Sequence, residues 1–461
     1  MTDSCNYDSF GRLTRVVRSA VAGREAISDL ASNPENALLP YGNGKSYGDS
    51  CHNNQGVLAD MASMNRILGF DPNTGIIDVE PGVMLHTIID LVAPHGWFLP
   101  VTPGTRFVTL GGAIANDVHG KNHHRQGTLG CHVEAITLLR STGVFHLSAA
   151  ENADLFSATI GGMGLTGIIT HARLKLMRVG SPDVIETRMP FTSLSQYFER
   201  AEAEDEANEY AVAWLDQLNG ERGVLMSANQ ADGGEFTPCA HKPKISVPFD
   251  LPFNALNGWS LRAFNSLFFA AKSRGAGKPQ RASWQSYFYP LDAVGNWNRL
   301  YGPRGLFQHQ SVIPFDAAEE AVPALLQASR AAGEASFLTV LKRFGAVESP
   351  GLLSFPTPGY TLTLDFPNRG ASTLALLDRL DAITLGAGGR INPYKDARMA
   401  ANTFKRGFPQ WVTLEALRDP VIMSDFWRRT VLNHSDEEQV SRSGNRSHLN
   451  EKVKQSLTEV S

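Results

Sequence analysis

Residues 41–49 read Tyr-Gly-Asn-Gly-Lys-Ser-Tyr-Gly-Asp, and residues 110–124 read Leu-Gly-Gly-Ala-Ile-Ala-Asn-Asp-Val-His-Gly-Lys-Asn-His-His, preceded by Pro-Gly-Thr-Arg at 103–106. Each stretch is a glycine-rich loop between strand-like runs. Glycine permits positive φ angles and lets a ligand approach the backbone closely. Successive backbone N–H groups can then converge on a pyrophosphate. The two loops, separated by little more than strands and one helix, predict a large phosphate-bearing cofactor spread across one domain.

The overall composition is that of a globular protein. The 461 residues are 42% hydrophobic and 19% charged, and this length favours two domains. A net charge of −4 argues against nucleic acid as a general partner. The first thirteen residues contain no apolar core of signal-peptide length, and no run has the length of a membrane span. We therefore expect a cytoplasmic protein.

Cysteine and histidine spacing gives no sign of a disulfide framework or a metal site. The cysteines are Cys5, Cys51, Cys131 and Cys239, and they form no CxxC pair. This spacing favours reduced thiols in the cytosol. The histidines at 119, 123 and 124 lack an acidic or cysteine partner at ligand spacing, so we expect no metal.

Hydrophobic periodicity in the first part of the chain predicts an α+β fold. Leu85, Ile88, Ile89 and Val92 follow helical spacing, which predicts a helix over 83–93. The runs at 57–61, 76–80, 135–140 and 144–147 read as strands, the last two as a hairpin. Helices and strands mix in this region as in α+β proteins.

Residues 162–167 spell Gly-Met-Gly-Leu-Thr-Gly, a literal GxGxxG. A dinucleotide-binding fingerprint requires a strand before this motif and a helix after it. Here a helix-like run at 153–159 precedes it and a strand-like run at 168–176 follows. The order is reversed, which disfavours a Rossmann domain and favours a tight turn touching a cofactor.

The middle region contains strands with one polar face. Gln308 and Gln310 fall on one side of the run 306–313, and Lys342 and Phe344 on one side of 338–344. In the run 360–366 the polar side carries Thr361, Thr363 and Asp365. An antiparallel sheet has this pattern where its polar side meets water or a ligand. Three such strands, one with a lysine, indicate a substrate site.

Two further segments have a distinct composition. Residues 247–275 are apolar and aromatic and end in basic residues, which fits a lid, a lipid-accepting surface or an ordinary amphipathic helix. The last residues, 434–461, are polar and lack aromatics, which predicts a disordered tail.

Several motifs together resemble one flavoprotein family. These are 43–49, 103–106, 111–115, 117–124, 161–169, 297–303, 342–344 and 394–398. They resemble the FAD-binding domain of the vanillyl-alcohol-oxidase (PCMH-type) flavoproteins, most closely the decaprenylphosphoryl-β-D-ribose 2-oxidases and more distantly the aldonolactone oxidases. The resemblance implies a two-part FAD domain, residues 1–182 and 388–461 including the polar tail. An inserted substrate (cap) domain, residues 183–387, would be built on an antiparallel sheet.

The resemblance also implies which residues contact FAD. These are Pro40, Tyr41, Gly42, Asn43, Gly44, Lys45, Ser46, Tyr47, Gly48, Asp49, Ser50, Gly104, Thr109, Leu110, Gly111, Gly112, Asn116, Asp117, Val118, His119, Ile169 and Asn392. Many relatives attach FAD covalently to a histidine of the first loop. Lys45 occupies that position here, so we expect non-covalent FAD.

A second set of residues matches positions that line the active site in the relatives. The substrate-binding candidates are Lys121, Gln308, Gln310, Lys342, Phe344, Thr361 and Thr363. Alcohol oxidation needs a hydride acceptor, a group that takes the hydroxyl proton, and positive charge near the reduced flavin. Lys395 is the candidate for that charge or for orienting the substrate, and His119 or Tyr47 for proton handling.

Departures from the relatives leave the substrate open. Thr361 and Thr363 stand where the ribose oxidases carry asparagine and cysteine, and Asn392 stands where they place an aromatic residue. The resemblance predicts oxidation of a secondary sugar hydroxyl, with a polyprenyl-phosphate pentose as candidate substrate and a 2-keto product. An NAD(P)H-dependent reductase partner and peripheral contact with the inner membrane are further expectations. The alternatives are an aldonolactone or alditol oxidase, a nicotinamide dehydrogenase, and a non-catalytic flavin-binding subunit.

Overall fold

The computed structural model describes residues 7–32, 37–218, 221–238, 243, 245–250, 258–334, 336 and 339–433. Cys5, Cys239, residues 251–257 of the aromatic segment and the polar tail 434–461 lie outside these ranges. Within them, no helix combines the length and the apolar character needed to cross a membrane.

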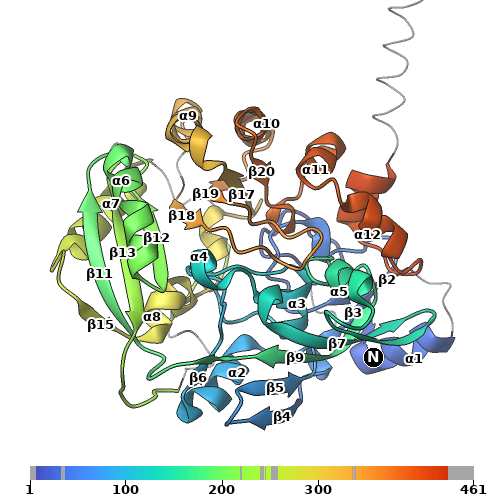
Figure 1. The fold of residues 1–461 in the computed structure, drawn as a ribbon. Helices are drawn as coiled ribbons and strands as arrows, with labels where there is room; N and C mark the ends of the chain where they lie inside the picture. Colours follow the sequence, from blue (N-terminus) through green and yellow to red (C-terminus); the bar gives the residue numbers. More distant parts are fainter. Residues whose placement is uncertain are drawn as a thin grey trace, which may run out of the picture.

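Two sheets are formed by strands that lie between Ser19 and Lys175 (Figure 1). The first is parallel, with the order β1-β3-β2: β1 Ser19–Ala22, β2 Leu38–Tyr41 and β3 Val57–Asp60. The second is antiparallel, with the order β4-β5-β9-β7-β8: β4 Ile67–Asp71, β5 Ile76–Val79, β7 Val133–Arg140, β8 Gly143–Leu147 and β9 Ile168–Lys175. A short antiparallel pair joins β6 Trp97–Phe98 to β10 Met177–Arg178.

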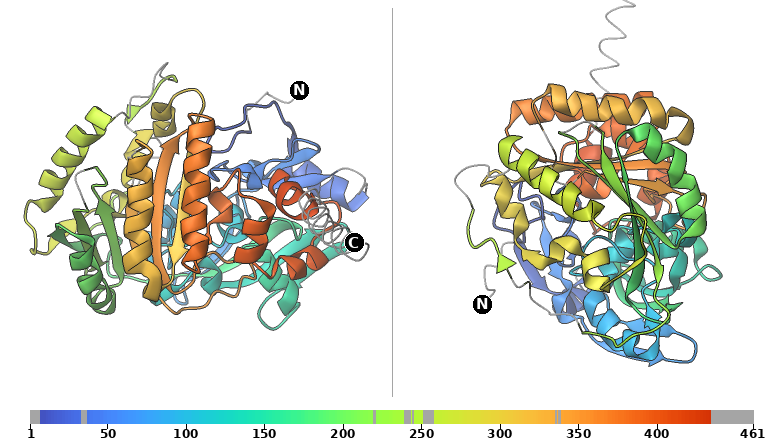
Figure 2. Two further views of the ribbon diagram at one scale, coloured as in Figure 1. Left: turned by 90° about the horizontal axis from the view of Figure 1, so that it is seen from above. Right: turned by 90° about the vertical axis from the view of Figure 1, so that its left-hand side faces the viewer.

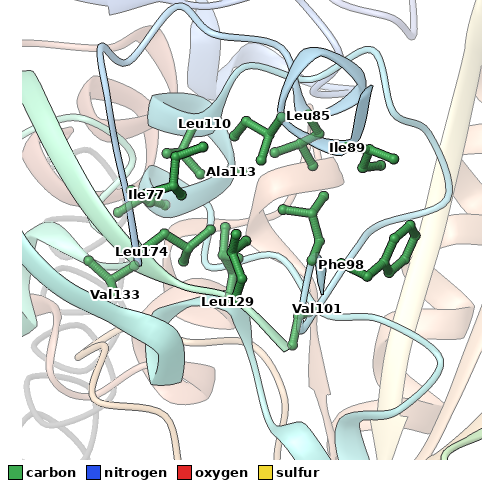
Figure 3. Packing of buried hydrophobic residues seen from close by; sticks show 14 of the residues in the cluster. Ile77, Leu85, Ile89, Phe98, Val101, Leu110, Ala113, Leu129, Val133 and Leu174 are labelled. Atoms are coloured by element: carbon green, nitrogen blue, oxygen red, sulfur yellow. The ribbon is translucent and has the colours of Figure 1, made fainter. Parts of the chain in front are cut away.

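The antiparallel sheet is held against helices by a large apolar cluster (Figure 3). Helices α2 Leu85–Val92 and α3 Leu110–Ala115 supply one side of it, with Leu85, Ile89 and Leu110 fully buried. The apolar stripe that predicted α2 is the face that packs here. Helices α1 Gly23–Ser32, α4 His123–Gln126 and α5 Ala153–Thr159 complete this region.

The strands between Val184 and Ile391 build a larger, eight-stranded antiparallel sheet, with the order β15-β11-β13-β12-β18-β19-β17-β20. Its strands are β11 Val184–Phe191, β12 Tyr210–Leu215, β13 Gly223–Gln230, β15 Gln280–Ala282, β17 Leu306–Ile313, β18 Val340–Phe344, β19 Gly359–Pro367 and β20 Arg390–Ile391. A parallel pair, β14 Ile245–Ser246 and β16 Val294–Gly295, lies apart from it.

One face of this sheet is covered by helices. They are α6 Leu194–Ala207, α9 Phe315–Ala331 and α10 Ala371–Gly386, and α9 and α10 lie side by side (Figure 2). Leu362, Leu364 and Phe366 of β19 are fully buried in the same cluster as these helices. Their alternate neighbours therefore point away from the helices. Helices α7 Gly258–Ser273 and α8 Trp284–Phe288 follow β14 in the chain.

The C-terminal segment packs against the N-terminal part of the chain. Helices α11 Ala401–Gly407, α12 Trp411–Leu417 and α13 Asp425–Trp427 share one apolar cluster with α1, β2 and β3. The backbone N–H of Leu38 donates to Val421 O at 2.8 Å, and the N–H of Met423 donates to Leu38 O at 2.9 Å. Segments nearly four hundred residues apart thus form one core.

Most elements expected from periodicity form as expected, and a few differ. The hairpin, the strand 306–313 and the helix 153–159 are confirmed. The helix expected over 83–93 spans 85–92 and continues as a 3₁₀ turn to His95. The reversed order around the GxGxxG is also confirmed, because the motif links α5 to β9, so it is not a Rossmann fingerprint. The parallel sheet of β1–β3 was not anticipated. The proposed domain boundaries stay a prediction.

Candidate active site

A cavity of about 1190 Å³ lies between the glycine-rich loops and the eight-stranded sheet. Most of the predicted site residues line it: Pro40, Gly42, Asn43, Gly44, Lys45, Ser46, Tyr47, Ser50, Gly104, Thr109, Gly111, Gly112, Asn116, Val118, His119, Lys121, Ile169, Gln308, Gln310, Lys342, Thr363, Asn392 and Lys395. The volume exceeds what one small metabolite needs. The cavity has room for a cofactor and a substrate together.

The loop side of the cavity has the shape expected of a cofactor cradle. Gly44 has φ +56°, and a side chain there would collide with the Tyr41 hydroxyl and Asp8 O. A Cβ at Gly104 would meet no atom within 4 Å, so this glycine leaves open space. The Ser50 hydroxyl is buried and has no hydrogen-bond partner among the described residues. An open cradle with an unused polar group fits a phosphate-bearing cofactor.

The first loop offers no histidine to the cavity. Lys45 lines it, with Nζ 5.5 Å from the ring centroid of Phe10. His52 follows the loop, but its Nδ1 lies 3.1 Å from Arg18 Nη2, and it does not line the cavity. Cys51 does line it, and burial raises the pKa of its thiol to about 12. The thiol therefore stays protonated, which makes it a poor nucleophile.

A chain of hydrogen bonds fixes the orientation of the Gln310 and His119 side chains in the cavity. Asn392 Nδ2 donates to Gln310 Oε1 at 2.9 Å, which orients the Gln310 amide. Gln310 Nε2 then donates to Thr361 Oγ1 at 3.1 Å and lies 3.1 Å from His119 Nε2. His119 must accept at Nε2, so its proton is on Nδ1. Burial, followed by Lys342 and Lys395, lowers the pKa of His119 well below its ordinary value.

Lys395 forms a second group with a buried carboxylate. Its Nζ lies 5.6 Å from the centroid of the Tyr47 ring. Asp365 is fully buried and accepts from Gln308 Nε2 at 2.6 Å, while its Oδ2 has no hydrogen-bond partner among the described residues. Burial lowers the pKa of Lys395 and raises that of Asp365. The Asp365 charge partly offsets the lowering at Lys395, and the Lys395 charge partly offsets the rise at Asp365. Burial also raises the pKa of Tyr47 well above its ordinary value.

Two more lysines face the cavity. Lys342 Nζ donates to Gly120 O at 3.2 Å and lies 5.6 Å from the ring centroid of Phe344. Lys121 Nζ lies 4.2 Å from the ring centroid of Tyr287 and donates to that residue's carbonyl. Burial lowers the pKa of both lysines to about 7. Glu186 opposes this lowering at Lys121 and Lys272 adds to it, while Lys395 and Lys121 add to it at Lys342. In the described part of the chain, neither has a carboxylate within 4 Å.

Comparison with known proteins is consistent with this geometry. Residues 24–148 match a family model described as an FAD binding domain. The chain is 35% identical over 428 residues to the decaprenylphosphoryl-beta-D-ribose oxidase of Mycolicibacterium smegmatis, which covers 88% of this chain and 92% of that protein. An uncharacterized Streptomyces coelicolor protein is 32% identical over 371 residues, 76% of this chain and all of the relative. L-gulonolactone oxidase of Mus musculus is 29% identical over 189 residues, 41% of each chain.

The chain belongs to the FAD-binding PCMH-type oxidoreductases. As a member of this family it is an FAD-dependent enzyme that acts on CH–OH groups. The FAD-domain model covers both glycine-rich loops, and the resemblance noted from the sequence is confirmed.

In this PCMH-type enzyme, some predicted cofactor contacts lie outside the cavity lining. Asp49 pairs with Arg429 at 3.0 Å, and Asp117 accepts from Ser349 and Ser354 at 2.5 and 2.6 Å. Tyr41, Gly48 and Leu110 also lie behind the lining, as do the substrate candidates Phe344 and Thr361. Phe344 packs on His119 with ring centroids 4.9 Å apart, and Thr361 holds Gln310. These last two act on the site through their neighbours.

Sequence reasoning placed Asp365 on the polar face of its strand but did not select it as a site residue. Its alternation with Thr361 and Thr363 was the available signal. The strand pairing sets Asp365 opposite Gln308, which brings its carboxylate into reach of the glutamine amide. Among the described residues, no group of three or more His, Cys, Asp or Glu side chains is arranged to hold a metal ion.

Proposed function

We propose that this enzyme oxidises a secondary hydroxyl group of a sugar, with a polyprenyl-phosphate pentose as the candidate substrate and a 2-keto sugar as the product. The observation that carries the proposal is the polar, lysine-bearing sheet face opposite the FAD-binding loops. Gln308, Gln310 and Asn392 offer amides for sugar hydroxyls, and Lys121 and Lys342 offer positive charge. Of the relatives described above, the one that aligns with the largest share of this chain is named for a ribose carried on decaprenyl phosphate. This name supports the substrate class.

FAD, when bound, supplies the hydride acceptor. The residues that would hold it are the cavity-lining part of 40–50, Gly104 and residues 109–119, with Ile169. We propose non-covalent binding, since the first loop presents Lys45 in place of a histidine. In the same proposal, residues 1–182 and the segment from 388 onward form the FAD-binding part, and residues 183–387 form the substrate-binding part.

The hydroxyl proton requires a base, and the geometry favours Lys395. Tyr47 keeps its proton because burial raises its pKa well above the ordinary value. The His119 Nε2 lone pair is occupied by the Gln310 amide. Burial lowers the pKa of Lys395, so its neutral amine is accessible near physiological pH. The Asp365 carboxylate, which accepts a hydrogen bond from Gln308, partly raises the pKa of Lys395 again. Because burial raises its own pKa, Asp365 can also hold a proton.

The test is anaerobic reduction of the FAD-loaded enzyme, followed through the loss of flavin absorbance. We expect a short-chain polyprenyl-phosphate pentose to reduce the flavin, and we expect its analogue lacking the 2-hydroxyl to leave it oxidised. Reduction by aldonolactones or alditols, with none by the lipid-linked pentose, would favour the alternative oxidase on the same fold. Bound FAD that no sugar reduces would favour a flavin-binding subunit. The reductase partner and the membrane contact stay predictions.

A further inference from the structure

The cavity-facing side of the eight-stranded sheet changes from polar to apolar along one row of paired residues. Gln310 of β17 pairs with Thr363 of β19, which pairs with Val340 of β18, which pairs with Trp214 of β12. All four line the cavity. The row therefore runs from an amide and a hydroxyl to aliphatic and aromatic groups. A ligand lying along it needs a polar end and an apolar end.

Helix α7 closes the apolar end of this row. The ring of Phe268 lies 4.7 Å from that of Trp214, and the rings of Phe264 and Phe268 stack with centroids 5.7 Å apart. Both phenylalanines line the cavity, yet Phe264 is 38% exposed and Leu267 on the same helix is 73% exposed. The aromatic lining thus continues from the cavity to the surface. Figure 2 shows α7 and α6 on opposite sides of strands β11–β13.

Two lysines lie where the polar and apolar parts meet. Lys121 and Lys272 both line the cavity, and within the described residues neither forms an ion pair. Glu186 also lines the cavity and partly holds up the pKa of both lysines, but its carboxylate is already paired with Arg188 at 2.6 Å. The Tyr287 hydroxyl, also at this end, is buried and has no partner in the described part. Lys121 donates only to the Tyr287 carbonyl, and neither the Lys272 ammonium nor the Tyr287 hydroxyl has an acceptor among the described residues. Together these groups favour an anion with several oxygens.

We propose that this end of the cavity is a binding site for a prenyl phosphate, with the phosphate at Lys121 and Lys272 and the chain between Trp214, Phe264 and Phe268. The chain would leave the protein along the exposed side of α7. The sugar carried on the phosphate would then lie over the polar end of the row, toward Gln310. The inference deepens the proposed sugar oxidation and rests on it for the identity of the sugar, but not for the binding of phosphate and chain.

The first test measures binding to the FAD-loaded enzyme by calorimetry, with three probes that contain no oxidisable sugar. These are farnesyl phosphate, farnesol and inorganic phosphate. We expect farnesyl phosphate to bind at least about tenfold more tightly than either of the others, since it occupies both parts of the site. Equal binding of farnesyl phosphate and inorganic phosphate would overturn the chain site, and equal binding of farnesyl phosphate and farnesol would overturn the phosphate site.

Variants separate the two halves of the site. Lys272→Gln should weaken farnesyl phosphate about tenfold and leave farnesol unchanged, because it removes one charge–phosphate contact. Phe268→Ala should weaken both prenyl ligands about tenfold, because a phenyl surface is lost. The matched controls are Lys278→Gln, an exposed lysine beyond the end of α7, and Val412→Ala, an exposed aliphatic on α12. Variants that match their controls would overturn the proposal.

The outcome is separable from that of the proposed function. Tight farnesyl phosphate binding that depends on Lys272 and Phe268, in an enzyme that oxidises no lipid-linked sugar, would support the site and refute the proposed oxidation. Oxidation of a lipid-linked sugar that is insensitive to both variants would support the oxidation and refute this site.

Discussion

Replacing Lys342 by methionine should stabilise the folded protein while weakening its hold on an anionic substrate. Lys342 lies in the cavity without a carboxylate partner in the described part of the chain, and its charge is further opposed by Lys395 and Lys121. Methionine keeps the length of the side chain and removes the charge. The substitution therefore tests whether the cavity is built to receive a negative charge that the protein itself does not supply.

The size of the effect follows from the pKa of Lys342. Burial lowers that pKa from 10.5 to about 7. At about 1.4 kcal/mol per tenfold change in proton affinity, the charged form is disfavoured in the folded state by roughly 5 kcal/mol. Because the side chain is partly exposed, solvent screening reduces this to about 2–3 kcal/mol. Loss of the hydrogen bond to Gly120 O costs about 1 kcal/mol, which leaves a net gain of about 1–2 kcal/mol at pH 6.

The sign of the stability difference between Lys342→Met and the wild type depends on pH. Between about 7 and 10.5 the unfolded lysine holds its proton while the folded one has lost it, so the wild-type stability rises with pH through this window. Lys342→Met lacks this gain. We expect its melting temperature to exceed that of the wild type by about 1–2 °C at pH 6, given the unfolding entropy of a chain of this size. At pH 9.5 the difference should vanish or reverse.

Thermal unfolding of the FAD-free protein at the two pH values measures this difference in melting temperature, with Lys278→Met, at an exposed position, as the matched control. The same preparations, reloaded with FAD, are then tested for binding of an anionic substrate, which should weaken about tenfold. A variant that is less stable than the wild type at pH 6, or whose stability difference is the same at both pH values, would refute the electrostatic reasoning. Unchanged substrate binding would remove Lys342 from the site.

Three further expectations concern the flavin end of the cavity. Lys395→Met should slow flavin reduction by about a hundredfold or more and leave FAD bound, as shown by rapid-mixing kinetics beside the absorbance spectrum; unchanged kinetics would exclude it as the base. Asp365→Asn removes the carboxylate that holds up the pKa of Lys395, so the rise of the reduction rate with pH should move to lower pH, and an unmoved profile would contradict the coupling. Denaturation and ultrafiltration should release all flavin into the filtrate, whereas flavin retained with the polypeptide would show a covalent link.

The elements with strong local periodicity were predictable, and for a clear reason. The strand 306–313 directs Gln308 and Gln310 to the cavity and Phe307 and Ile313 to the helix-covered core. The helix before the GxGxxG carries its apolar residues at helical spacing. Burial on one side imposes these periods on the sequence directly. The glycine loops were equally readable, because side chains at Gly44 and Gly48 would collide with other atoms of the chain itself. Lys395 and His119 were located only through resemblance to a family, since a single lysine or histidine has no pattern.

What could not be predicted depends on contacts between distant segments. Asp117 and Asp49 belong to the cofactor motifs, yet their carboxylates turn to Ser354 and Arg429, more than two hundred residues away. Asp365 gains its place beside Gln308 only through the pairing of β17 with β19. The tautomer of His119 follows from the orientation of Gln310, which Asn392 fixes. Pairing partners of this kind leave no periodic trace in a single sequence.

Four of the five lysines that line the cavity, all except Lys45, form a row in which each charge acts on its neighbour, and this order predicts which substitutions are independent. Lys272 lowers the pKa of Lys121, and both Lys121 and Lys395 lower that of Lys342. Among these lysines, Asp365 acts on Lys395 alone. Effects on kcat/KM should therefore add for Lys272→Gln and Lys395→Met at the two ends, because distant sites rarely couple. Lys342→Met and Lys395→Met, as neighbours, should show a measurable interaction energy in a double-mutant cycle. Strong coupling between the two ends would mean that phosphate and flavin share one electrostatic site, and the separation of the cavity into a reacting end and a chain-binding end would fail.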